Sequence, residues 1–103
     1  MVCLGVDFSK VSDFVAKKHN MAILKCLLES PSGTGFNAIL KAVGECTPRV
    51  LSTRLKELEK LKIIQKNLVL GEKPKIEYRA QPKALGLKKA IAELEKWGQK
   101  ELP

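Results

Sequence analysis

Residues 47–79 read TPRVLSTRLKELEKLKIIQKNLVLGEKPKIEYR, and this stretch decides the fold. Thr47 can accept hydrogen bonds from the free N–H groups at the start of a helix. Pro48 suits the first helical position, where no N–H donor is needed. Apolar residues then recur at helical spacing and predict one inward stripe, made of Leu51, Leu55, Leu58 and Leu61.

A β-hairpin is predicted directly after this helix. The segments IIQKNLVL (63–70) and KIEYRA (75–80) read as strands, and GEKP between them supplies the Gly and Pro of a turn. Tyr78 alternates with Ile76 and is expected to pack beneath the helix. The hairpin would form a wing over about residues 63–80.

A second helix is predicted just upstream, over FNAILKAV (36–43), and Gly44 suits its end. Only a few residues separate it from Thr47, so the two helices form a helix-turn-helix over about residues 36–61. Two further helices and a loop are expected before it: a helix at residues 7–18, a largely buried helix that starts at Asn20 and is ended by Ser30-Pro31, and a loop at residues 31–35.

The last helix is expected over about residues 82–98 and carries a broad apolar stripe. Such a stripe is wider than a small domain needs for packing its own terminal helix, which predicts a homodimer through this helix. The chain of 103 residues is long enough for one core, so residues 1–103 are expected to form a single α+β domain, a winged helix-turn-helix. The predicted dimer residues are Leu87, Ala90, Ile91, Leu94 and Trp97.

The charge distribution points to a polyanionic partner. Lys and Arg total 19 against 11 Asp and Glu, a net charge of +8. Residues 47–79 hold nine of these cations and four of these acids, so the excess lies in the helix and the hairpin. Aromatic residues make up 5% of the chain, which leaves little for stacking on single-stranded bases.

The outward face of the helix after Thr47 is the candidate reader of duplex DNA. Arg49 lies in the first turn, where recognition helices meet base edges, and a guanidinium can pair with guanine through two hydrogen bonds. Ser52 and Thr53 could contact bases or phosphates, and Lys56 could contact phosphate. The alternative is an ordinary solvated face. The complete DNA-binding set, including the wing, is Thr47, Arg49, Ser52, Thr53, Lys56, Lys73, Lys75 and Arg79.

No constellation for catalysis, a metal or a cofactor is apparent. His19 is the only histidine and suits a helix cap or the surface, and no nucleophile stands beside a base. The three cysteines include no C-x-x-C pair, which favours a reducing compartment, with Cys26 and Cys46 as packing residues. Without a signal peptide or a membrane-spanning apolar run, a cytoplasmic, soluble protein is expected.

The chain resembles the HxlR-type winged-helix transcriptional regulators, relatives of the MarR group. The resemblance rests on the order and spacing of five segments: ILKCLLES, GFNAIL, TPRVLSTRLKELEKLKII, PKIEYRAQPKALG and LEKWG. The family often has Trp where this chain has His19, and Gly where it has Lys62. Some relatives sense oxidants through an N-terminal Cys that precedes Pro. Here Cys3 precedes Leu4 and is the candidate redox residue.

Family resemblance implies dimers that bind double-stranded operator DNA. We therefore expect a sequence-specific, homodimeric DNA-binding regulator that acts by occluding a promoter. The alternative is a winged helix that serves as a protein-interaction or assembly module without specific DNA readout.

Overall fold

The computed structural model describes residues 5–103, with side chains from Phe8 onward. Helices make up most of the chain, and three short strands form one sheet, so the observed class is the predicted α+β winged helix-turn-helix. Along the chain the elements are α1 (Gly5–Ala16), α2 (Asn20–Glu29), β1 (Thr34–Gly35), α3 (Phe36–Val43), α4 (Pro48–Lys60), β2 (Ile64–Val69), β3 (Lys75–Ala80), the 3-10 helix η1 (Pro82–Leu85) and α5 (Gly86–Glu101).

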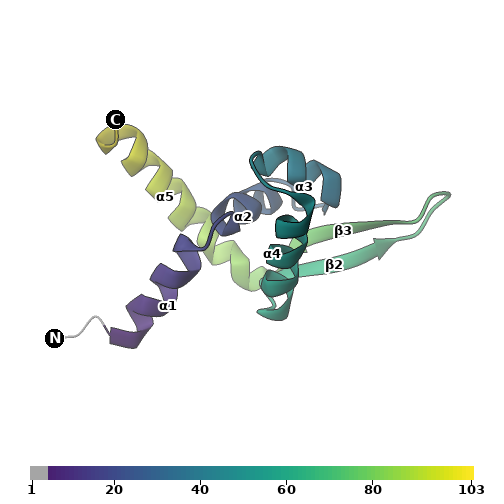
Figure 1. The fold of residues 1–103 in the computed structure, drawn as a ribbon, viewed down its shortest axis with the longest axis horizontal. Helices are drawn as coiled ribbons and strands as arrows, with labels where there is room; N and C mark the ends of the chain where they lie inside the picture. The colour runs from purple at the N-terminus through teal and green to yellow at the C-terminus, as the bar shows by residue number, and fades with distance from the viewer. Residues whose placement is uncertain (1–4) are drawn as a thin grey trace.

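Helix α2 lies at the centre of the fold, with α3, α4 and the sheet around it (Figure 1). Burying an aliphatic side chain stabilises a fold by roughly 1.5–3 kcal/mol, so the core cluster fixes where α4 and the hairpin lie. The fully or nearly fully buried members of that cluster are Ile23, Leu24, Leu27, Ile39, Leu51, Leu55, Leu58, Ile64 and Tyr78.

The sheet is antiparallel, with strand order β1-β3-β2. The strand β1 pairs Thr34 with Tyr78 and Gly35 with Glu77, so the predicted loop at 31–35 is corrected: its last two residues form a strand. Gly33 precedes this strand with φ 119°, and a Cβ there would lie 2.8 Å from the Glu77 carboxylate. Glycine therefore suits the place where this strand approaches β3.

Helix α4 ends in a Schellman motif, which corrects the prediction for Leu61. The N–H of Lys62 donates to the Glu59 carbonyl (2.9 Å), and the N–H of Ile63 donates to the Leu58 carbonyl (3.0 Å). Lys62 adopts the left-handed conformation, with φ 61°. Because the helix ends here, Leu61 leaves the inward stripe and is 52% exposed.

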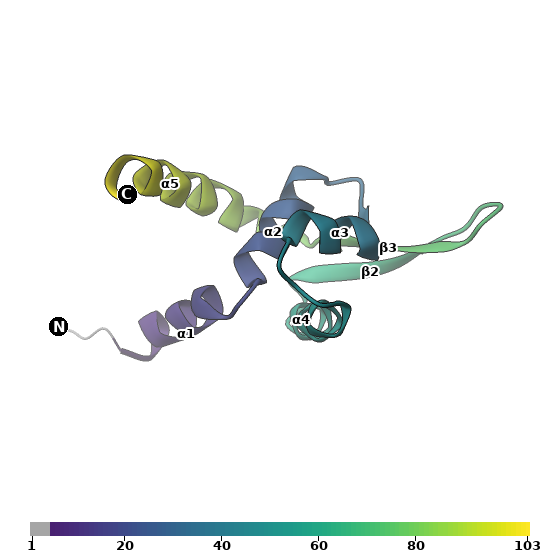
Figure 2. The ribbon, with the colours of Figure 1, turned by 45° about the horizontal axis from the view of Figure 1, so that its top comes forward.

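The molecule is elongated, with extents of 57 × 30 × 24 Å. The hairpin projects from one end, while α1 and α5 diverge from the body at the other (Figures 1 and 2). Helix α1 occupies residues 5–16 rather than the predicted 7–18, and the last helix begins as the short 3-10 turn η1. Within the described residues, no helix is long and apolar enough to cross a membrane.

Candidate nucleic-acid interface

The start of α4 is held by the cap that the sequence predicts. The Thr47 hydroxyl oxygen accepts a hydrogen bond from the Val50 N–H (3.2 Å), and Pro48 takes the first helical position. Helix α3 ends at Val43, and Gly44 follows it as the C-cap with φ 88°. A short, capped turn therefore joins the two helices and orients the first turn of α4.

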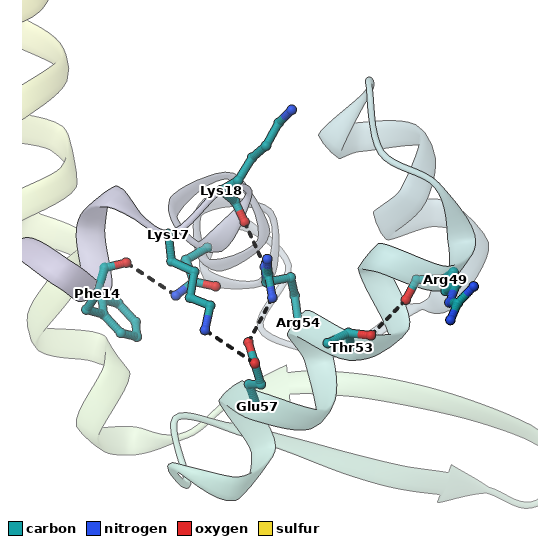
Figure 3. A network of polar contacts seen from close by, with 8 residues as sticks. Phe14, Lys17, Lys18, Arg49, Thr53, Arg54 and Glu57 are labelled. Atoms are coloured by element: carbon teal, nitrogen blue, oxygen red, sulfur yellow. Dashed lines mark hydrogen bonds and ion pairs between the residues drawn. The ribbon is translucent and has the colours of Figure 1, made fainter.

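The outward face of α4 carries the predicted reading residues. Arg49, Thr53 and Lys56 are exposed, Thr47 is exposed at the helix start, and Ser52 is half-buried. The Thr53 hydroxyl donates to the Arg49 carbonyl (3.1 Å), which uses its hydrogen and leaves its oxygen able to accept (Figure 3). Spacings of three and four residues bring the four helical side chains to one side.

The predicted wing cations are spread along the hairpin rather than gathered. Lys73 lies in the connection between β2 and β3. This connection forms the far tip of the hairpin (Figure 1). Lys75, whose side chain is exposed, forms an ion pair with the largely shielded Glu77, 3.5 Å from nitrogen to oxygen. Arg79 lies nearer the body, opposite Gln65 and on the face away from buried Tyr78. Lys73 is thus the cation farthest along the wing.

One residue of α4 that sequence reasoning missed is Arg54, which faces the body rather than solvent. Its Nε donates to the Lys18 carbonyl (3.1 Å), and its Nη1 donates to Glu57 Oε1 (3.0 Å). Glu57 Oε2 accepts from Lys17 Nζ at 3.3 Å, so the end of α4 is tied to the corner between α1 and α2 (Figure 3). The i,i+3 pair of Arg54 with Glu57 is visible in the sequence, but the bond to a carbonyl 36 residues away is not.

That corner is shaped by His19 and Asn20. His19 occupies the N-cap position of α2 with φ 74° and makes no side-chain cap hydrogen bond. The buried Asn20 donates from Nδ2 to the Phe14 carbonyl (3.3 Å). A side chain from α2 therefore holds the end of α1.

Comparison with known proteins finds a family whose helix-turn-helix corresponds to this arrangement of α3 and α4. The model of the HxlR-like helix-turn-helix family matches residues 14–103. The chain belongs to the HxlR-like helix-turn-helix family. Its curated relative YvaP of Bacillus subtilis strain 168, an uncharacterised HTH-type transcriptional regulator, is 31% identical over 90 residues, which are 87% of this chain and 82% of YvaP.

Solved structures share the fold of this HxlR-like chain. Reduced YodB, a transcriptional regulator of B. subtilis, is 22% identical, with a TM-score of 0.82 over 99% of this chain and 96% of YodB. A protein of Porphyromonas gingivalis W83 assigned to the MarR family is 20% identical, with a TM-score of 0.83 over 99% of this chain and 98% of its own. At these identities the likeness concerns the fold.

The predicted dimer stripe of α5 divides into two groups. Ile91 is only 8% exposed and lies with Leu28 around a small hollow between α2 and α5, and Leu87 packs half-buried against the core. Their assignment to a dimer face stays a prediction, and their packing within the chain leaves them less surface for a partner than Leu94 and Trp97 have. Ala90 is exposed, and Leu94 and Trp97 are 55% and 57% exposed. The Lys25–Glu95 ion pair also ties α5 to α2.

The structure describes two of the three cysteines, Cys26 and Cys46. Cys26 and Cys46 are half-buried and pack against the core, as predicted. Burial, and then the charge of Glu29, raise the pKa of the Cys26 thiol, so it resists forming the reactive thiolate. Cys3, the candidate redox residue, lies outside the described residues.

Proposed function

We propose that this HxlR-like chain is a transcriptional regulator that binds double-stranded DNA sequence-specifically as a homodimer and represses by occluding a promoter. The carrying observation is a capped helix, α4, whose outward face exposes Arg49, Thr53 and Lys56. That helix and its wing also hold most of the positive excess of the chain. Residues 1–103 act as one winged-helix domain, and no catalytic reaction is assigned to it.

The side chains have separate roles in this proposal. Arg49 reads a base edge in the major groove from the first turn of α4. Thr47, Ser52, Thr53 and Lys56 contact phosphates or neighbouring bases and set the register. In the wing, Lys73 reaches a second stretch of backbone from the tip, and Lys75 and Arg79 add positive charge along the hairpin.

The proposed dimer face is the distal part of α5 together with α1. Leu94 and Trp97 are exposed on α5, with Ala90 beside them. Helix α1 exposes an apolar row at helical spacing: Phe8, Val11 and Val15. Both helices leave the body on the side opposite the wing (Figure 2), so the exposed apolar side chains of α1 add to those that α5 offers a partner.

A protein-interaction module is the second candidate, and a feature of the wing favours it. Leu68 and Ile76 lie opposite each other in the hairpin and are exposed, as is Leu70 nearer the tip. Exposed apolar side chains of this kind can form a docking surface. In that case the basic face of α4 would stay in solvent.

Titration with labelled DNA separates the two functions. We expect duplex to bind more tightly than the corresponding single strand, with an affinity that falls steeply between about 50 and 200 mM salt as counterions are released. The control is Lys73→Gln, which should lower the salt slope by about one. Absence of duplex binding at the lower salt concentration would favour the protein-interaction module.

A further inference from the structure

Apolar packing sets the position of α4 on the body, and directional contacts refine its rotation about its own axis. Its inward stripe of Leu51, Leu55 and Leu58 is buried, but contacts between aliphatic side chains are non-directional. Close packing keeps such a helix in place, so only a small rotation about its axis remains for directional contacts to restrict. Arg49 lies on the outer side of the same helix, so any such rotation displaces it.

Arg54 supplies directional contacts. Its guanidinium is planar and always charged, and its N–H groups point in fixed directions. Two of them are used at once, on the Lys18 carbonyl at 3.1 Å and on Glu57 at 3.0 Å. Its side chain is 20% exposed, so the group is largely shielded from water. Arg54 thus joins α4 to the backbone of the α1–α2 corner.

Glu57 completes the connection from the same helix. One carboxylate oxygen accepts from Arg54 and the other accepts from Lys17, one residue beyond the end of α1. Figure 3 shows Arg54 and Glu57 directed toward the corner, whereas Arg49 points away from it. Two side chains one turn apart on α4 therefore meet the residues that connect α1 to α2.

We propose that Arg54 and Glu57 are positioning residues that fix the orientation of α4 against the α1–α2 corner, and thereby the spacing of the two reading helices in a dimer. The second part rests on the proposed function, because α1 belongs to the proposed dimer face. Base readout tolerates little displacement of the reading side chain, so orientation controls specificity more than overall affinity.

The contacts among Lys17, Arg54 and Glu57 contribute little to folding stability. Their effect on the orientation of α4 can therefore be measured in variants that still fold. Lys17 and Glu57 are more than 40% exposed, and exposed ion pairs contribute little to folding. Arg54→Gln should therefore leave a folded protein. The matched control is Lys60→Gln, which removes the same charge from the exposed last turn of α4 and leaves these contacts intact. Arg54→Lys keeps the positive charge but removes the planar guanidinium, and so tests whether charge alone is sufficient to hold the orientation of α4.

The first measurement is the orientation of α4 in the free protein. Residual dipolar couplings of backbone amides report the relative orientation of α1, α2 and α4. We expect Arg54→Gln to turn α4 relative to α1 and α2, Arg54→Lys to restore it only in part, and Lys60→Gln to match the wild type. An unchanged orientation of α4 in Arg54→Gln would overturn the proposal, whether or not the protein binds DNA.

The second measurement uses the duplex that the wild-type protein selects from a random pool, together with versions in which the half-sites are one base pair closer or farther apart. We expect Arg54→Gln to lower the ratio of selected to random duplex affinity by about tenfold, within the range of one lost base contact, and to weaken the preference for spacing. If Arg54→Gln and Lys60→Gln lowered the affinity for every duplex by the same factor, the proposed effect of Arg54 on DNA specificity would be overturned. If the wild type selects no duplex, the proposed function fails, and the dipolar couplings still decide the positioning role.

Discussion

Arg49 and Lys73 are both exposed cations, yet their positions predict different effects on binding. Arg49 lies in the first turn of α4, and Lys73 lies at the tip of the wing. We expect Arg49→Ala to reduce discrimination between selected and random duplex by about 1–3 kcal/mol. Lys73→Ala should weaken both duplexes by about the same factor. Competition titrations of both variants give the two ratios; equal scaling of every affinity by Arg49→Ala would exclude base readout by that residue.

Glu57 predicts a pH dependence of folding. Burial pushes its pKa upward, but the hydrogen bonds and charges of Lys17 and then Arg54 outweigh this, so its pKa lies below the ordinary value. A lowered pKa in the folded state means that the carboxylate stabilises the fold above the unfolded-state pKa, near 4.3, and that this is lost as pH falls through the folded-state pKa.

Chemical denaturation of wild type and Glu57→Gln across this range measures the contribution. We expect the wild type to be slightly more stable at neutral pH and the difference to close in acid. A difference that stays constant from neutral pH to well below 4.3 would show that the ionised carboxylate is not responsible.

The two ends of α4 make separate predictions at the scale of the element. At the start, Thr47→Ala removes the cap to the Val50 N–H and should cost about 0.5–2 kcal/mol of folding free energy. Thr53→Ala is the matched control, because this hydroxyl bonds only to its own helix at Arg49 and alanine favours helix. Thermal unfolding compares them; equal destabilisation by both changes would argue against the cap.

At the end of α4, Lys62 holds a left-handed conformation that glycine adopts without strain. Lys62→Gly should be neutral or stabilise the fold by up to about 1 kcal/mol, because relief of backbone strain exceeds the added entropy of the unfolded chain. Lys60→Gly, in the helical last turn, should instead cost about 1 kcal/mol. A loss of stability in Lys62→Gly as large as in Lys60→Gly would contradict the motif.

Elements with strong local signals could be predicted from the sequence, and elements that depend on distant partners could not. The cap at Thr47 and the strands of the wing follow from neighbouring residues. The strand β1 has only two residues, and its pairing with Tyr78 and Glu77 spans more than 40 positions. Periodicity cannot reveal a strand of that length.

At the scale of the whole molecule, the α5 stripe shows what periodicity leaves open. Leu87, Ile91 and Leu94 recur at helical spacing, and the sequence does not say which of them the chain's own α2 covers. Burial divides them, with Ile91 inside and Leu94 exposed. For the same reason the Arg54 contact could not be predicted, since its acceptor is a backbone carbonyl at a distant corner. The reading residues proposed on α4 remain a prediction.

This division gives opposite expectations for two α5 variants. Leu94→Glu with Trp97→Glu places charge on the proposed dimer face and should yield a folded monomer. Ile91→Ala empties a core position and should cost about 2–5 kcal/mol of folding free energy. Sedimentation velocity and thermal unfolding of both variants test this. A wild-type dimer that persists in the double variant would place the interface elsewhere.

Selection of duplexes from a random pool by the wild-type protein tests sequence-specific binding by a homodimer most directly. Two α4 helices related by a two-fold axis should select a palindrome whose half-sites lie about one helical turn, roughly 34 Å, apart. Two chains should bind each selected duplex, and the double variant of Leu94 and Trp97 should lose the preference for two half-sites. Enrichment without any shared sequence, or a single half-site bound by one chain, would contradict it.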